Sequence, residues 1–276
     1  MNPAELSQNN PYIAVGLSVF EDVESLPRCL DSVLADDSFR PYVKVLAIEG
    51  KYLGYPIDHE LSEDGSRELL AAYKDRYPLH IDMYDFPNLH ERFKRQKYVD
   101  IAARENIPWL LILDSDEYLQ IAKDRTEKLI KELKHIEEEW HDTNIDNPLP
   151  TQRVGNVCQV MCIDIGDNGL PGHSVARPRL WYRPQDMHYT TKHYWFARKD
   201  EVPNPNDTSN YRQDNNAVIF NSKYKSLSVN NMVIWHSHAD RTEDRELRRR
   251  VYEFERLPKL EGSAKLGIFD KENIKQ

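Results

Sequence analysis

The first half of the chain alternates short apolar runs with longer stretches in which apolar residues recur every three or four positions. This alternation constrains the fold more than any other feature, because it is typical of parallel strands joined by helices. The expected strands cover residues 12–20, 43–49, 79–84 and 109–113, and the expected helices cover residues 23–34, 66–77 and 93–105. We therefore predict an α/β fold with a mostly parallel central sheet that is flanked by helices.

The pattern changes after residue 120. A charge-rich helix is expected first, and a polar connector that contains proline follows it. The remaining expected elements are this helix at residues 124–140, strands at 157–163, 178–182, 217–220 and 232–235, and a basic helix at 242–257. We expect one domain whose second half contains a smaller mixed sheet.

The composition excludes several classes of protein. The 276 residues include 37 basic and 46 acidic side chains, which gives a formal net charge of −9 and no overall attraction for nucleic acid. No apolar run approaches the roughly 18 residues of a transmembrane segment, and the first residues lack the pattern of a signal peptide. Three cysteines cannot build a disulfide framework. We expect a cytoplasmic protein, with a membrane-peripheral location as the alternative. The oligomeric state is left open.

A cluster of carboxylates directly follows the most hydrophobic expected strand, residues 109–113. It contains Asp114, Asp116 and Glu117, with Ser115 between the two aspartates. Ligands of open α/β sheets bind at the carboxyl ends of strands, and clustered like charges repel unless a cation or a basic group neutralises them. We predict that Asp114 and Asp116 bind Mg²⁺ or Mn²⁺ together with a diphosphate. A structural alternative remains, because acidic residues are also favoured in the first turn of a helix.

Two other expected strands end in residues that can bind a ligand. Glu49 ends the second strand, so its carboxylate should reach the same edge, where a nucleoside base or ribose would lie; solvation of a strand end is the alternative. The strand near residue 235 ends in His236 and His238. Because one residue separates the two histidines, we expect their side chains to point to opposite faces, so that one of them meets the metal.

Several segments carry a family pattern. Residues 20–32 are similar to an opening strand and "LxxCLxS" helix, Asp64-Gly65-Ser66 to a "DGSxD" segment, and Arg95-Gln96-Lys97 to a basic segment before the metal strand. Residues 109–117 are similar to a "W-apolar-DxDE" motif. With these segments the chain resembles the family 2 type of nucleotide-sugar-dependent glycosyltransferases, which have the Rossmann-like GT-A fold.

This resemblance implies a nucleotide-diphosphate sugar as donor, linked to UDP or GDP, and Mn²⁺ or Mg²⁺ as cofactor. The residues implied in donor binding are Phe20, Glu21, Glu49, Asp64, Lys97, Asp114, Ser115 and Arg245, and those implied in metal binding are Asp114, Asp116, His236 and His238. Residues 1–120 would form the nucleotide-sugar-binding half, residues 121–240 the acceptor-side half, and residues 241–276 a C-terminal helix and tail. The basic run around Arg245 could close over the phosphates or form a solvated helix face.

The chain departs from the family pattern at several positions. Ser18 replaces the usual proline of the first strand, and residues 51–61 form an unusual insertion, so the nucleotide is left open. Tyr194 stands where relatives place a glutamate. An inverting enzyme needs a base that deprotonates the acceptor hydroxyl, and Asp186 and His193 are candidates for it. A retaining enzyme needs no such base.

The predicted function is a metal-dependent glycosyltransferase, of the hexosyl or a similar type. It would move a sugar to a hydroxyl of a glycan, a lipid-linked or a small-molecule acceptor. One alternative is a non-catalytic nucleotide- or sugar-binding protein on the same fold, which the missing glutamate favours. A second alternative is a sugar nucleotidyltransferase. That enzyme would need a glycine-rich basic loop after the first strand, whereas residues 18–22 are acidic and contain no glycine.

Overall fold

Eight strands form one mixed sheet in the order β3-β2-β1-β4-β7-β6-β10-β5. The computed structural model of the chain describes residues 11–122, 124–142, 153–166, 168–189, 196–198, 224–237, 247, 248 and 251. The strands of the sheet are β1 (Ile13–Val19), β2 (Val43–Glu49), β3 (Ile81–Asp85), β4 (Trp109–Asp114), β5 (Glu117–Ile121), β6 (Arg153–Ile165), β7 (Pro171–Tyr182) and β10 (Tyr224–Ser237). Two short strands, β8 (Met187–Tyr189) and β9 (Phe196–Arg198), pair separately.

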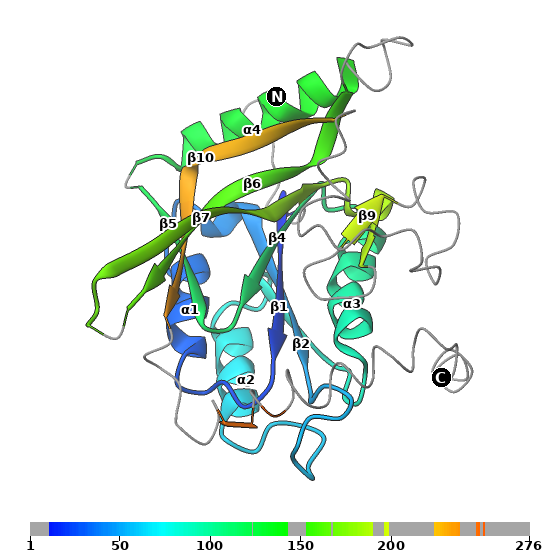
Figure 1. Cartoon of the computed structure of the whole chain (residues 1–276), viewed down its shortest axis with the longest axis vertical. Coiled ribbons are helices and arrows are strands. Elements are labelled where there is room, and N and C mark those ends of the chain that lie inside the picture. Colours follow the sequence, from blue (N-terminus) through cyan, green and yellow to red (C-terminus); the bar gives the residue numbers. More distant parts are fainter. Residues whose placement is uncertain are drawn as a thin grey trace.

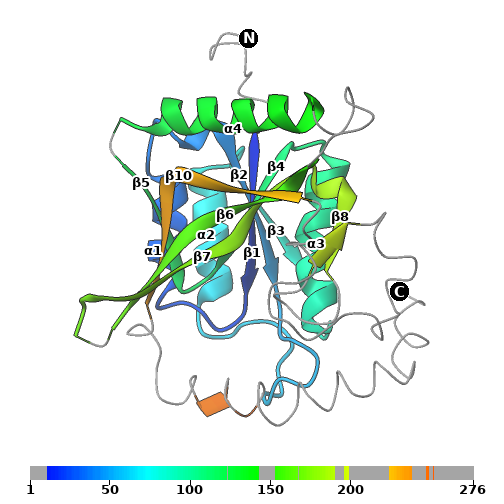
Figure 2. The same cartoon turned by 45° about the horizontal axis from the view of Figure 1, so that its top comes forward.

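Helices cover both faces of this sheet. They are α1 (Leu26–Leu34), α2 (Ser66–Arg76), α3 (Glu91–Arg104) and α4 (Thr126–His141). One hydrophobic cluster joins the sheet to α1, α2 and α4, and a second cluster joins its other face to α3 and β8. Figures 1 and 2 show α1 and α2 on one side of β1 and α3 on the other. The α/β architecture with flanking helices is therefore as predicted. Among the described residues, no helix is both long and apolar enough to cross a bilayer.

The strand directions place several carboxyl ends at one edge of the sheet. β1 pairs in parallel with β2 and β4, whereas β7 runs antiparallel to both β4 and β6. β10 is parallel to β6, so β4, β6 and β10 all run in the same direction. The ends of β4, β6 and β10 therefore meet at the edge that also holds the ends of β1 and β2, which we call the carboxyl edge.

The first strand, β1, lies inside the core and packs closely against α3. Every residue of β1 is buried, as expected for a parallel strand with helices on both faces. At Gly16, a Cβ atom would lie 2.6 Å from Cδ2 of Tyr98. The absence of a side chain at Gly16 thus allows α3 to approach β1 closely.

The second half of the chain differs from the prediction in one respect. Its strands do not form a smaller sheet of their own, because β7 pairs antiparallel with β4, with Trp109 opposite Tyr182 and Leu111 opposite Leu180. β6, β10 and β5 then extend the same sheet. Among the strands that the structure describes, only β8 and β9 lie in a separate sheet. The expectation of a separate acceptor-side sheet is wrong for the larger strands, since hydrogen bonding along β4 joins both halves.

Candidate functional site

The carboxyl edge brings together side chains that are far apart in the sequence. Asp114 ends β4, Asp164 lies at the end of β6, and His236 lies at the end of β10. Between β4 and β5 the chain turns tightly, and the Asp116 carbonyl accepts a hydrogen bond of 3.2 Å from the Ser237 amide. This contact holds the turn against β10, so Asp114, Asp116 and His236 share one edge, as predicted.

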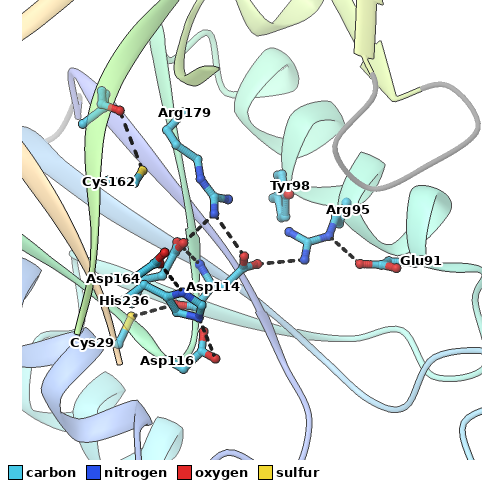
Figure 3. Close-up of polar contacts among 12 residues, drawn as sticks. Cys29, Glu91, Arg95, Tyr98, Asp114, Asp116, Cys162, Asp164, Arg179 and His236 are labelled. Atoms are coloured by element: carbon cyan, nitrogen blue, oxygen red, sulfur yellow. Dashed lines mark hydrogen bonds and ion pairs between the residues drawn. The ribbon is translucent and has the colours of Figure 1, made fainter. Parts of the chain in front are cut away.

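His236 lies between two carboxylates (Figure 3). Its Nε2 is 3.4 Å from Oδ2 of Asp116, and its Nδ1 is 3.1 Å from Oδ1 of Asp164. Burial alone would lower the pKa of His236, but the hydrogen bond and charge of Asp116, the charge of Glu117 and the bond to Asp164 together raise it to about 9. The ring is therefore held in a strongly anionic surrounding.

Asp114 is held by two arginines. Nη2 of Arg95, from α3, lies 2.7 Å from Oδ1 of Asp114, and Nη2 of Arg179, from β7, lies 3.2 Å from Oδ2. Both guanidinium groups are buried, and Figure 3 shows them on opposite sides of the carboxylate. The two arginines neutralise Asp114 and fix its orientation.

Glu117 is the third carboxylate of the motif and is paired with Arg179. Its Oε1 accepts from Nη2 of Arg179, and its Oε2 accepts from the Asp114 amide at 2.9 Å. Burial raises the pKa of Glu117 to about 7, although the charge of Arg179 acts in the opposite direction. Glu117 thus supports the turn between β4 and β5 and anchors Arg179.

The donor atoms of Asp116 and His236 suit a hard divalent cation. Metal–ligand bonds of about 2.0–2.1 Å at right angles bring two neighbouring ligands about 3 Å apart, close to the 3.4 Å observed between these side chains. Asp164 in turn contacts the other ring nitrogen, an arrangement typical of metal-binding histidines. Among the described residues, no three His, Cys, Asp or Glu side chains are grouped to hold a metal ion. A cation here would need further ligands from a bound anion or water.

The predicted nucleotide contacts at the ends of β1 and β2 form a hydrogen-bonded network within the protein. Glu49 is fully buried, and its carboxylate accepts from the Ser62 amide at 2.8 Å and from Nη1 of Arg67 at 2.6 Å. Oδ1 of Asp64 accepts from the Ser66 amide at 2.9 Å, and its Oδ2 accepts from the Val23 amide at 3.0 Å. Glu49 and Asp64 therefore hold the segment between β2 and α2 in place.

The remaining predicted donor contacts lie around this segment. Oε1 of Glu21 accepts from the Glu63 amide and contacts His59, each at 2.9 Å. The Phe20 ring packs edge-on against Tyr55, with centroids 5.5 Å apart. Ser115 is buried in the turn after β4. Lys97 lies with its Nζ 4.7 Å from the Phe86 ring centre.

Lys94 was not among the predicted site residues, although it lies at the carboxyl edge. Its side chain is fully buried, and its Nζ donates to the carbonyls of Val19, at 3.0 Å, and Gly50. Burial lowers the pKa of Lys94 to about 7, against the opposing charge of Glu49. Lys94 ties the ends of β1 and β2 together beneath the predicted nucleotide contacts.

The structure does not bring Asp186 to the carboxyl edge. Asp186 follows β7, and the Arg183 amide bonds to the Pro108 carbonyl just before β4 begins. Asp186 therefore lies at the opposite end of β4 from Asp114, where its Oδ2 accepts from Nε of Arg183 at 2.6 Å. His193, His238 and Arg245 lie outside the described residues.

Arg179 and Asp164 complete the site, and neither was predicted as a residue that contacts the metal or the donor. A sequence signal exists for both: Arg179 directly precedes the apolar residues Leu180 and Trp181, and Asp164 falls near the end of an apolar run. A charged residue within a strand that is otherwise buried needs a partner of opposite charge. That rule identifies Arg179 as a member of a buried polar network, whereas Asp164 is partly exposed.

Comparisons with known proteins give only slight likenesses. No family model matches the chain, and no curated protein does. S. aureus TarS 1–349 in complex with UDP-GlcNAc is 12% identical with a TM-score of 0.49, over 93% of this chain and 71% of that one. The same TarS fragment in complex with UDP is 14% identical with a TM-score of 0.42, over 64% of this chain. The chain spans 49% of the length of that fragment.

The third structure is the mannosyltransferase PcManGT from Pyrobaculum calidifontis, in complex with GDP-Man and Mn²⁺. It is 16% identical with a TM-score of 0.33, over 55% of this chain and 35% of that one. Likenesses of this size assign the chain to no family.

Proposed function

We propose that the chain is a metal-dependent glycosyltransferase of the GT-A type. It would move a sugar from a UDP- or GDP-linked donor to a hydroxyl of a carbohydrate-type acceptor. One observation carries the proposal: Asp116 and His236 face each other across 3.4 Å at the carboxyl edge, beside Asp114. A carboxylate and an imidazole at this edge suit a cation that is shared with a diphosphate.

In this proposal Asp116 and His236 hold Mn²⁺ or Mg²⁺. The bound cation supplies positive charge that stabilises the departing diphosphate. Asp114 is held between Arg95 and Arg179, and its oriented carboxylate can accept a hydrogen bond from a hydroxyl of the donor. Both arginines are already paired with carboxylates, so in this proposal the positive charge that the diphosphate needs comes from the cation.

Calorimetric titration of UDP and GDP, each with and without Mn²⁺, tests the proposal. We expect at least one nucleotide to bind more tightly with Mn²⁺, and Asp116→Ala to abolish that difference. Asp82→Ala is the matched control. Asp82 lies on β3, at the other end of the sheet, and pairs with Lys44 and Lys74. Equal nucleotide affinity with and without Mn²⁺ in the wild type would contradict the proposal. A gain in affinity with Mn²⁺ that is as large in Asp116→Ala as in the wild type would also contradict it.

Turnover distinguishes the enzyme from its two alternatives. A glycosyltransferase releases free nucleoside diphosphate from at least one nucleotide sugar in a panel of donors and acceptors. A nucleotidyltransferase would instead release pyrophosphate from a nucleoside triphosphate and a sugar phosphate. A binding protein would show metal-dependent affinity and neither reaction.

A further inference from the structure

We propose that Asp164 is a positioning residue, which turns Nε2 of His236 toward the cation. This inference rests on the proposed function, because it requires a metal between Asp116 and His236. Nε2 is then the ring nitrogen of His236 that binds the metal.

The sheet register places Asp164 beside His236. In the parallel pairing of β6 with β10, Asp164 lies directly opposite His236, and Glu117 lies opposite His236 on β5. Side chains at paired positions of neighbouring strands project from the same face of a sheet. The position of Asp164 is therefore set by hydrogen bonds along two strands, and it does not depend on a loop.

The two ring nitrogens of His236 contact different carboxylates. Nδ1 of His236 lies 3.1 Å from Oδ1 of Asp164, and Nε2 lies 3.4 Å from Oδ2 of Asp116 on the other side of the ring. Figure 3 shows Asp164 and Asp116 on different sides of His236. A carboxylate has no hydrogen to donate, so Nδ1 must carry the hydrogen of this bond. Once a metal takes the place of the other ring hydrogen, the lone pair of Nε2 faces Asp116.

Asp164 remains close to the site but differs from a metal ligand. Its side chain is 34% exposed, and its Oδ1 contacts Nδ1 of the His236 ring. Carboxylates that orient metal-bound histidines fix the ring and raise its basicity, and their loss typically weakens metal binding about 10–100-fold. The same range is expected here, without loss of the fold.

Mn²⁺ binding in the presence of UDP or GDP tests the inference, with free Mn²⁺ measured by electron paramagnetic resonance. We expect Asp164→Asn to raise the Mn²⁺ dissociation constant about 10–100-fold. Asp82→Asn is the control, because Asp82 also pairs with two basic groups, at 2.7 and 3.0 Å, but lies on β3, five strands away from β6. We expect the affinity of Asp82→Asn to match that of the wild type.

A spectroscopic measurement separates positioning from a general effect on stability. With diamagnetic Mg²⁺ and the nucleotide bound, ¹⁵N shifts of the His236 ring should report a hydrogen on Nδ1 in the wild type and a changed pattern in Asp164→Asn. Wild-type Mn²⁺ affinity in Asp164→Asn overturns this inference alone. No Mn²⁺ binding by the wild type overturns the proposed function as well, and a hydrogen on Nε2 of the metal-bound wild type overturns the positioning role directly.

Discussion

Nε2 of His236 lies 3.4 Å from Oδ2 of Asp116, so a residue near the end of β10 faces the turn that follows β4. More than a hundred residues separate the two in the chain. They meet because β10 and β4 run in the same direction and end at the same edge of the sheet. Substitution of Asp116 or of His236 therefore tests each side of this pair separately.

His236→Ala should weaken Mn²⁺ binding by at least about tenfold, because it removes one of two protein ligands. Affinity for the nucleotide without metal should change little. The measurement is an Mn²⁺ titration at saturating nucleotide. His135→Ala, an exposed histidine on α4, is the control, and equal Mn²⁺ affinity in both variants would exclude His236 as a ligand.

Arg179→Met should destabilise the fold by about 3–5 kcal/mol, since it leaves the buried carboxylate of Glu117 without its arginine partner. Arg179 contacts both Asp114 and Glu117, and Glu117 is only 4% exposed. Urea unfolding at neutral pH measures the change. Arg177→Met, two residues earlier on β7 and partly exposed, should cost under about 0.5 kcal/mol; a similar loss in both variants would contradict the prediction.

Lys94→Met should flatten the dependence of stability on pH above neutrality. Burial lowers the pKa of Lys94 to about 7, whereas an unfolded lysine titrates near about 10.4. Between these values the unfolded chain binds a proton that the folded chain lacks, so the free energy of unfolding rises with pH. Lys94 should contribute up to about 1.4 kcal/mol per pH unit to this rise, and nothing below pH of about 7.

Urea unfolding of the wild type and Lys94→Met between about pH 7.5 and 9.5 measures this slope. Lys128→Met is the control, because Lys128 is exposed on α4 and its substitution should keep the wild-type slope. Parallel curves for the wild type and Lys94→Met would show that Lys94 titrates normally.

Asp64→Ala should reduce stability by about 1–3 kcal/mol, because Asp64 accepts two backbone hydrogen bonds. These bonds come from the Ser66 and Val23 amides and join the start of α2 to the segment before α1. Thermal unfolding measures the loss. Glu63→Ala is the control, since the Glu63 side chain is 72% exposed.

Nucleotide titration of folded Asp64→Ala reveals whether the residue has a second task. Unchanged affinity assigns Asp64 to the structure alone. Weaker affinity at a temperature where the variant is fully folded assigns it a contact with the nucleotide.

The amino-acid sequence by itself determined the central strands and helices. The predicted strand at residues 43–49 matches β2, and the strand at 109–113 matches β4 to within one residue. Burial on both faces requires a continuous apolar run, which is visible without a structure. Short or exposed strands lack that signal. β5 begins at Glu117 inside the acidic motif, and the first residues of β7 are exposed, so the sequence pattern indicated neither β5 nor the first half of β7.

The candidate site also has residues that the sequence predicts and partners that only the tertiary structure reveals. Asp114, Asp116 and His236 could be predicted because each follows an apolar run and parallel strands end at a common edge. Only the tertiary structure decided which groups neutralise them: Arg95 and Arg179 at Asp114, and Asp164 at His236. The sequence does not indicate which of these residues pair with one another. They depend on the antiparallel insertion of β7 beside β4 and on the register of β6 with β10, which arise from hydrogen bonds between segments far apart in the chain.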